Sequence, residues 1–171
     1  TWRPTTFLTA SGSLVFEKLD ENTQWVENVE KGAFVHYVFG RLRQTTVRLS
    51  ARVNYTITPD LSIQVFASPF VSAGQYGQYK DLVRPRALPV ESQFDPYAYA
   101  GSPDFTYRSF RMTNVLRWEY RPGSVLYVVW QQGRESAADA GEFRFGRDLG
   151  RAISSPGTNV FLVKASFWMN Y

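Results

Sequence analysis

Apolar and polar residues alternate along most of this chain. In residues 47–57, Val, Leu, Ala, Val, Tyr and Ile take every second position, while Arg, Ser, Arg, Asn and Thr take the others. A period of two places successive side chains on opposite faces of a strand. The alternation recurs in four further segments, 61–71, 105–121, 124–134 and 159–171. Helical periodicity is almost absent, so the sequence predicts an antiparallel, all-β protein.

Residues suited to tight turns separate these segments at 58–60 and 121–124. With the first turn as the loop, apolar residues oppose each other in four pairs, Ile57 with Leu61, Tyr55 with Ile63, Val53 with Val65 and Ala51 with Ala67. In the second hairpin we expect one apolar face, made of Leu116, Trp118, Tyr120, Val125, Tyr127 and Val129.

Two long connections, 72–104 and 135–158, follow the outward strands of these hairpins. Weaker strand patterns at 5–16, 23–30 and 33–42 bring the total to about eight. Outer-membrane barrels have short periplasmic turns and long extracellular loops, and eight strands can close a small barrel. The predicted fold is a single-domain antiparallel up-and-down transmembrane β-barrel, or the C-terminal part of a larger one, with the C-terminus on the side of the tight turns.

Composition limits the kind of membrane protein that these apolar stripes could belong to. No stretch approaches the roughly 18 apolar residues of a spanning helix, mean hydropathy is −0.29, and aromatic residues reach 16%. Only a barrel satisfies its backbone in lipid with such a composition. We therefore expect a lipid-facing set of Val47, Leu49, Val53, Tyr55, Ile57, Leu61, Ile63, Val65, Leu116, Trp118, Tyr120, Val125, Tyr127, Val129, Phe161, Val163, Phe167 and Met169. The alternative is a soluble barrel or sandwich that binds an apolar ligand inside.

The opposite face carries the charges. The proposed lumen-lining set comprises Arg48, Arg52, Arg111, Arg117, Glu119 and Lys164. In a wide barrel these groups would favour anionic solutes. In a narrow barrel they would pair with carboxylates and form a plugged polar core.

The loops offer weaker candidates. Tyr76, Tyr79, Tyr97 and Tyr99 lie near acidic residues, where tyrosines can stack on and hydrogen-bond a sugar, or anchor the barrel at the interface. The second connection carries a charged set that fits a solvated loop better than a hydrolase, Asp139, Glu142, Arg144, Arg147 and Asp148.

Several activities have little support in the sequence. His36 is the single histidine, and no nucleophile elbow accompanies it. We predict no catalytic residue, no cofactor and no metal site, since a lone histidine without cysteines makes no ligand set. The net charge is +4, but the basic residues are scattered along the chain, which argues against nucleic acid as a partner.

Four stretches resemble one known family: "YVFG", "RVNYTITPDLSIQVFASPFVSAGQY", "VLRWEYRPGSVLYVVWQQGR" and "NVFLVKASFWMNY". From about Tyr37 to Tyr171 the chain is similar to the C-terminal region of an uncharacterised bacterial outer-membrane family. In that family a carbohydrate-binding-module family 9-like domain usually precedes a β-barrel of unknown function. The resemblance implies a Gram-negative outer membrane and a link to glycans, and it implies no reaction.

The expected function is passage or docking of a solute or glycan, with long loops outside the cell and the C-terminus in the periplasm. The expected partners are outer-membrane lipid, a glycan, and the barrel-assembly machinery through the strand that ends at Tyr171. An outer-membrane enzyme is the weakest alternative.

Overall fold

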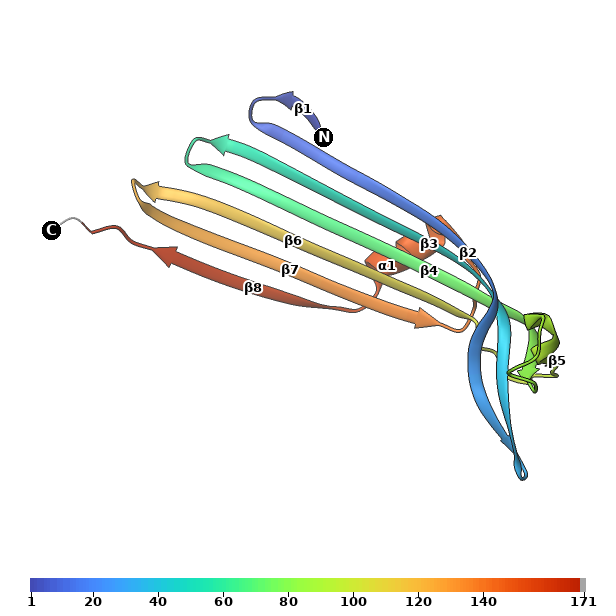
Figure 1. Ribbon diagram of the computed structural model, residues 1–171. Coiled ribbons are helices and arrows are strands. Elements are labelled where there is room, and N and C mark those ends of the chain that lie inside the picture. The colour runs from blue at the N-terminus through green and yellow to red at the C-terminus, as the bar shows by residue number, and fades with distance from the viewer. Residues whose placement is uncertain (170–171) are drawn as a thin grey trace.

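One long, twisted antiparallel sheet dominates the molecule (Figure 1). The computed structural model describes residues 1–169. The elements are β1 (Trp2–Thr5), β2 (Leu8–Lys31), β3 (Phe34–Thr58), β4 (Leu61–Leu82), the 3-10 helix η1 (Val90–Gln93), β5 (Phe94–Pro96), β6 (Phe105–Arg121), β7 (Ser124–Ala138), α1 (Phe145–Ser154) and β8 (Gly157–Ser166). The all-β, antiparallel prediction is confirmed.

The strands follow one another through the sheet in the order β1-β2-β3-β4-β6-β7-β8, and the short β5 pairs with the end of β4. The sheet is open: β1 and β8 form opposite edges and do not pair with each other. The prediction that these strands close a small barrel is therefore wrong for the described residues. Two of the eight, β1 and β5, span only four and three residues, so the sheet has too few long strands to close.

The N-terminal strands are longer than the sequence pattern indicates. Segments 5–16 and 23–30 fall largely within β2, while 33–42 and 47–57 belong to the single strand β3. The polar stretches between these segments stay in the strands because their charges pair across the sheet, as Asp20 does with Arg41. The resulting β2–β3 hairpin runs past its neighbours and bends out of the sheet (Figure 1).

The long connections are correspondingly shorter than expected. β4 continues to Leu82 and β7 to Ala138. The remaining connections contain η1 and β5 in one case and α1 in the other.

The register of the β3–β4 hairpin agrees with the sequence at three of its four predicted pairs. Tyr55 pairs with Ile63, Val53 with Val65 and Ala51 with Ala67. The fourth differs, because a register shift between Thr56 and Thr58 pairs Leu61 with Thr58 instead of Ile57.

The predicted faces of the β6–β7 hairpin are wrong in β7. Leu116 pairs with Val128 and Trp118 with Leu126, whereas Tyr127 pairs with Arg117. Val125, Tyr127 and Val129 therefore share a face with the charged residues. An irregularity between Glu119 and Arg121 accounts for this, because a shift of one residue moves a whole strand to the other face.

Register now defines two faces across the whole sheet, since directly paired residues point the same way. The apolar face carries the apolar band, Leu14, Leu49, Ala51, Val53, Ile63, Val65, Ala67, Met112, Leu116, Val128, Trp130, Phe161 and Val163. Phe161 and Val163 of the predicted lipid-facing set belong to it through pairing with Trp130 and Val128. The polar face is the opposite one.

The last expected strand is shorter than predicted. β8 ends at Ser166, so Phe167 and Met169 lie beyond it. Its end pairs with Val125 beside the β6–β7 turn, which confirms that this segment runs back to the end of the sheet with the tight turns. The expected assembly signal at Tyr171 lies outside the described residues.

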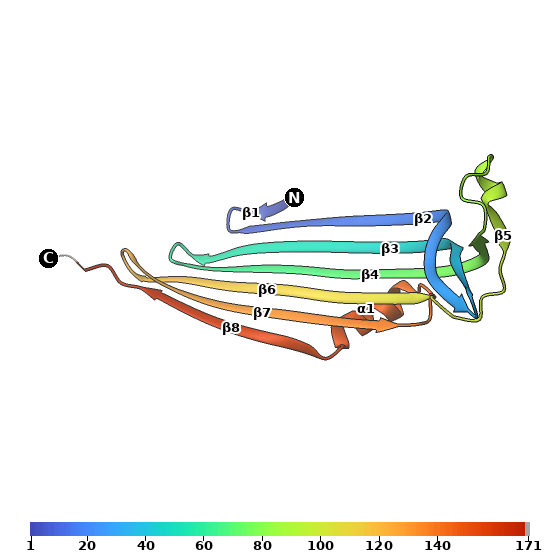
Figure 2. The ribbon, with the colours of Figure 1, turned by 60° about the horizontal axis from the view of Figure 1, so that its bottom comes forward.

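Helix α1 lies across β4, β6 and β7 (Figure 2). It packs on the apolar face, because it contacts Arg108 and Arg134, which share that face with Phe110. Among the described residues, no helix is long and apolar enough to cross a membrane.

Candidate functional site

The six charged residues predicted to line a lumen all lie on the polar face. Arg48 and Arg52 come from β3, and Arg111, Arg117 and Glu119 from β6, while Lys164 comes from β8. Successive pairings from β3 to β8 place them on this face; for example, Tyr127 pairs with both Arg117 and Lys164. The structure thus places on one face residues that are up to 116 positions apart in the sequence, Arg48 and Lys164. Whether they line a lumen stays a prediction.

Two phenylalanines that the sequence analysis missed share the polar face. The Arg48 guanidinium lies 5.6 Å from the ring centre of Phe70, and that of Arg52 lies 5.6 Å from the ring centre of Phe66. Each pair is a cross-strand neighbour in the β3–β4 register. A guanidinium over a ring is held electrostatically while its outer edge remains available to a ligand. Two shallow hollows, of about 250 and 220 Å³, adjoin Arg52 and Phe66.

The remaining charges of the polar face are only partly neutralised. Arg117 forms an ion pair of 2.7 Å with Glu119, and Arg111 one of 3.4 Å with Glu135. Arg48, Arg52 and Lys164 have no ion-pair partner among the described residues. The polar face therefore presents a surplus of positive charge.

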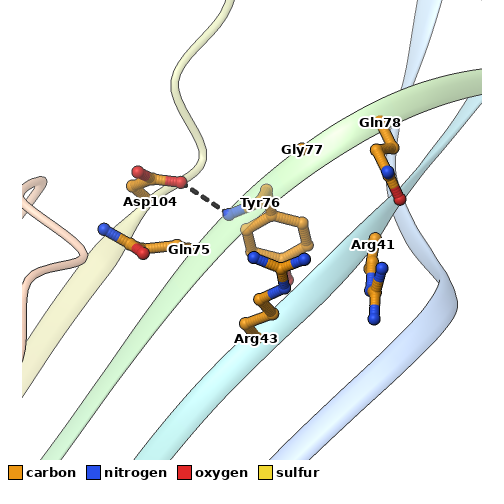
Figure 3. Close-up of a pocket in the computed structure, with 7 residues that line it drawn as sticks. All are labelled: Arg41, Arg43, Gln75, Tyr76, Gly77, Gln78 and Asp104. Carbon is orange, nitrogen blue, oxygen red and sulfur yellow. Dashed lines mark hydrogen bonds between the residues drawn. The ribbon is translucent and has the colours of Figure 1, made fainter.

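A cleft of about 420 Å³ opens near the ends of the strands opposite the tight turns, which we call the rim (Figure 3). It is lined by Arg41, Arg43, Gln75, Tyr76, Gly77, Gln78 and Asp104. Of the four predicted glycan-contact tyrosines, Tyr76 alone lines it. The backbone N–H of Tyr76 donates to Asp104 over 2.7 Å, and burial together with the Asp104 carboxylate raises the pKa of Tyr76.

Backbone irregularity and an ion pair shape the cleft. Gln78 has a φ of 48°, rare for a residue with a side chain, and sits where the β3–β4 register shifts between Phe39 and Arg41. Arg41 donates two hydrogen bonds of 2.6 Å to Asp20, which hold the pKa of Asp20 below its ordinary value. The cleft thus combines fixed amide, carboxylate and guanidinium groups beside one ring.

The other three predicted tyrosines contact protein groups near the rim. The rings of Tyr79 and Tyr99 lie 4.8 Å apart, and the Tyr99 hydroxyl donates to Glu27 over 2.7 Å. This hydrogen bond is the largest reason that the pKa of Tyr99 rises to about 12. Tyr97 packs 5.0 Å from the ring of His36. These rings tie the β5 connection to the β2–β3 hairpin.

His36 pairs with an acid that the sequence analysis did not assign to it. Its Nδ1 lies 2.6 Å from Asp81 Oδ2, and Asp81 also accepts the Tyr37 backbone N–H. A histidine beside a carboxylate is part of a hydrolytic triad, but no serine or threonine hydroxyl among the described residues bonds to the ring. Within residues 1–169, no group of three metal-binding side chains comes together.

A buried ion pair fixes α1 to the sheet. Arg108 of β6 donates two hydrogen bonds, of 3.0 and 2.8 Å, to Asp148 of α1, and their side chains are 3% and 0% exposed. Asp148 also accepts from Arg147 and from the Arg144 backbone N–H. Burial alone would raise the pKa of Asp148, yet these bonds hold it below its ordinary value. Sequence analysis placed Asp148 in a solvated loop, which is wrong because the loop folds back as α1.

Comparison with protein families gives one match. The model described as "Domain of unknown function (DUF5916)" matches residues 3–171. Neither the curated proteins nor the solved structures gave a match. The chain belongs to the DUF5916 family.

Proposed function

We propose that this member of the DUF5916 family forms the C-terminal part of a β-barrel in a Gram-negative outer membrane, where a solute, in particular an anionic or glycan one, docks or passes. The apolar face meets acyl chains, the polar face meets water inside the barrel, and the rim lies outside the cell. Further strands pair with the two open edges of the sheet.

One observation carries this proposal: the two faces of the central strands β3 and β4 differ, one being apolar and the other largely polar. Val53 and Ile63 lie on the apolar face, while their sequence neighbours Arg52, Asn54 and Gln64 lie on the polar face. Large apolar side chains remain uncovered on the apolar face; Phe161 and Val163 are 67% and 70% exposed. Such exposure is unfavourable in water and favourable in lipid.

Aromatic residues near the tight turns add support. The rings of Trp118 and Tyr120 lie 6.1 Å apart, as do those of Tyr120 and Phe167, and Phe7 lies 6.2 Å from Tyr55. All belong to the turn end, where an aromatic belt would meet the inner boundary of the membrane.

The charges of the polar face and the rim suggest the kind of solute. Arg48 and Arg52 have no carboxylate partner, and the cleft offers Arg43 beside Tyr76. Guanidinium groups attract anions, and aromatic rings stack on sugars. Both features fit a negatively charged glycan better than a cation.

Replacing Val53 with Arg tests which face meets lipid. The charge at mid-membrane depth should cost about 2 to 4 kcal/mol and reduce the folded fraction in vesicles, measured by heat-modifiable gel migration. Asn54→Arg is the matched control, because the next residue points to the polar face, and we expect it to fold normally. Equal behaviour of the two variants would contradict the assignment of faces.

Arg52 provides a test of the solute. In planar bilayers that contain the protein, Arg52→Glu should shift the reversal potential in a salt gradient toward cations, while Arg52→Lys should leave it unchanged, since lysine keeps the charge. If the reversal potential were the same in the wild type and in Arg52→Glu, Arg52 would not line the path of the solute.

A soluble barrel with an apolar interior remains the second candidate. One observation favours it: α1 packs on the apolar face, as an element over a core would do. In that case the protein stays in solution without detergent. Val53→Arg would still reduce the folded fraction more than Asn54→Arg, because Val53 would lie in the core. Solubility without detergent is therefore the measurement that separates the two candidates.

A further inference from the structure

The surface of α1 divides into stripes of different chemistry. Asp148, Ala152 and Ser155, which follows the helix, are buried against the sheet. At 100° per residue, Phe145, Leu149 and Ile153 fall on one flank of this buried stripe, and Arg144, Arg147 and Arg151 on the other. Phe145 is 44% and Ile153 48% exposed, so the apolar flank is uncovered. The helix therefore has an apolar flank and a basic flank that the sheet does not bury.

The position of α1 coincides with the end of the apolar band. Near the helix this face is mixed: Thr106, Arg108, Arg134 and Ser136 lie beside the buried apolar side chains of Val71, Ala73 and Phe110. Arg108 bonds to Asp148, and Arg134 donates to the Ser155 carbonyl at the end of the helix. Beyond it, toward the rim, lies the cleft with Arg43 and Asp104. Helix α1 thus covers the transition from the apolar band to a charged surface.

We propose that α1 is an interfacial helix, which lies at the boundary between acyl chains and anionic lipid headgroups on the outside of the barrel. Phe145, Leu149 and Ile153 enter the acyl region, while the arginine flank contacts headgroup phosphates. This inference rests on the proposed function, since it requires that the apolar band faces lipid. It adds a lipid-binding surface at the rim and assigns α1 a function in addition to that of the barrel strands.

The charges of the arginine flank suit this partner. Arg144 and Arg147 both pair with Glu142, at 2.7 and 3.2 Å, and Arg147 also pairs with Asp148 at 3.1 Å. Arg151 has no ion-pair partner among residues 1–169 and is exposed. The flank therefore keeps a positive surplus, and guanidinium groups bind phosphate oxygens through paired donors. An apolar flank beside a basic flank is the pattern of helices that lie in a membrane surface.

Because the chain contains no cysteine, single labels can be placed at will. Ile153→Cys and Ser154→Cys are neighbours on opposite flanks, and Val163→Cys lies in the apolar band. Each variant carries an environment-sensitive fluorophore, and the protein is folded into phosphatidylcholine vesicles, with or without phosphatidylglycerol, whose acyl chains are brominated to quench nearby fluorophores.

We expect the label at 153 to emit at shorter wavelength and to be quenched at least about twofold more than the label at 154. Phosphatidylglycerol should enlarge that difference, and Arg151→Glu should cancel the enlargement without changing quenching at 163. Equal quenching at 153 and 154, with strong quenching at 163, would overturn the interfacial helix and leave the proposed function standing. Lack of quenching at 163 would overturn both.

Discussion

The two ends of the sheet are built from different interactions. At the turn end, β3–β4 and β6–β7 close through two-residue turns, and ring contacts among Trp118, Tyr120 and Phe167 surround them. At the rim, two ion pairs, Asp20 with Arg41 and Arg108 with Asp148, hold the elements together with the His36–Asp81 hydrogen bond and the ring contact of Tyr79 with Tyr99. Tight turns and ring contacts therefore fix one end, whereas ion pairs and polar contacts have the larger share at the other.

This contrast has a physical consequence. Backbone turns and ring contacts depend little on pH or salt, while ion pairs depend on both. The rim should respond to solution conditions and to loss of single charges more strongly than the turn end. Under the proposed function, the rim is also the end that meets ligands outside the cell.

The largest effect is expected at the buried pair of the rim. Asp148→Ala leaves Arg108 buried without its partner, so it should lower the free energy of unfolding by about 3 to 5 kcal/mol. Glu135→Ala is the control, because it breaks the exposed pair with Arg111 and should cost about 1 kcal/mol or less. Urea unfolding followed by tryptophan fluorescence measures both. Similar losses in the two variants would show that α1 is not anchored through Arg108.

A smaller effect is expected at the turn end. Gly123 has a φ of 77°, and an added Cβ would lie 3.0 Å from Trp168 Cβ. Gly123→Ala should therefore cost about 1 to 3 kcal/mol. Gly133→Ala in β7 serves as the control, since its Cβ would meet nothing within 4 Å. If the same unfolding assay showed no loss for Gly123→Ala, the turn would be adopting another conformation.

How far the sequence predicts this molecule differs between the two hairpins. In β3 the alternation is strict, so Arg48 and Arg52 could be assigned to one face and Val53 to the other, and the register confirms both. In β7 every residue from Val125 to Trp130 is apolar, so periodicity cannot choose a face. The choice depends on the irregularity near Glu119, which accepts the Gly123 N–H.

The helix and the rim contacts were beyond sequence analysis for a different reason. Phe145, Leu149 and Ile153 have helical spacing, but Gly146 and Gly150 interrupt them, and glycine disfavours helix by about 1 kcal/mol each. A tertiary contact stabilises the helix despite these glycines, because Asp148 bonds to Arg108, 40 residues earlier. The His36–Asp81 pair spans 45 residues. Local patterns carry no information on such pairs.

The smallest effect concerns the proton of Tyr99 at the rim. Its hydrogen bond to Glu27 raises the pKa of Tyr99 to about 12, from about 10 in the unfolded chain. A raised pKa in the folded state means that the stabilisation is complete below pH 10 and is lost as pH rises through 12. Glu27→Gln should lower the pKa of Tyr99, seen as an earlier rise of one tyrosinate in an ultraviolet absorbance titration. Glu30→Gln on the same hairpin is the control and should leave the titration unchanged. Identical titrations of the wild type and Glu27→Gln would mean that this bond does not tie the β5 connection to the β2–β3 hairpin. Polar contacts would then stabilise the rim less than the comparison with the turn end predicts.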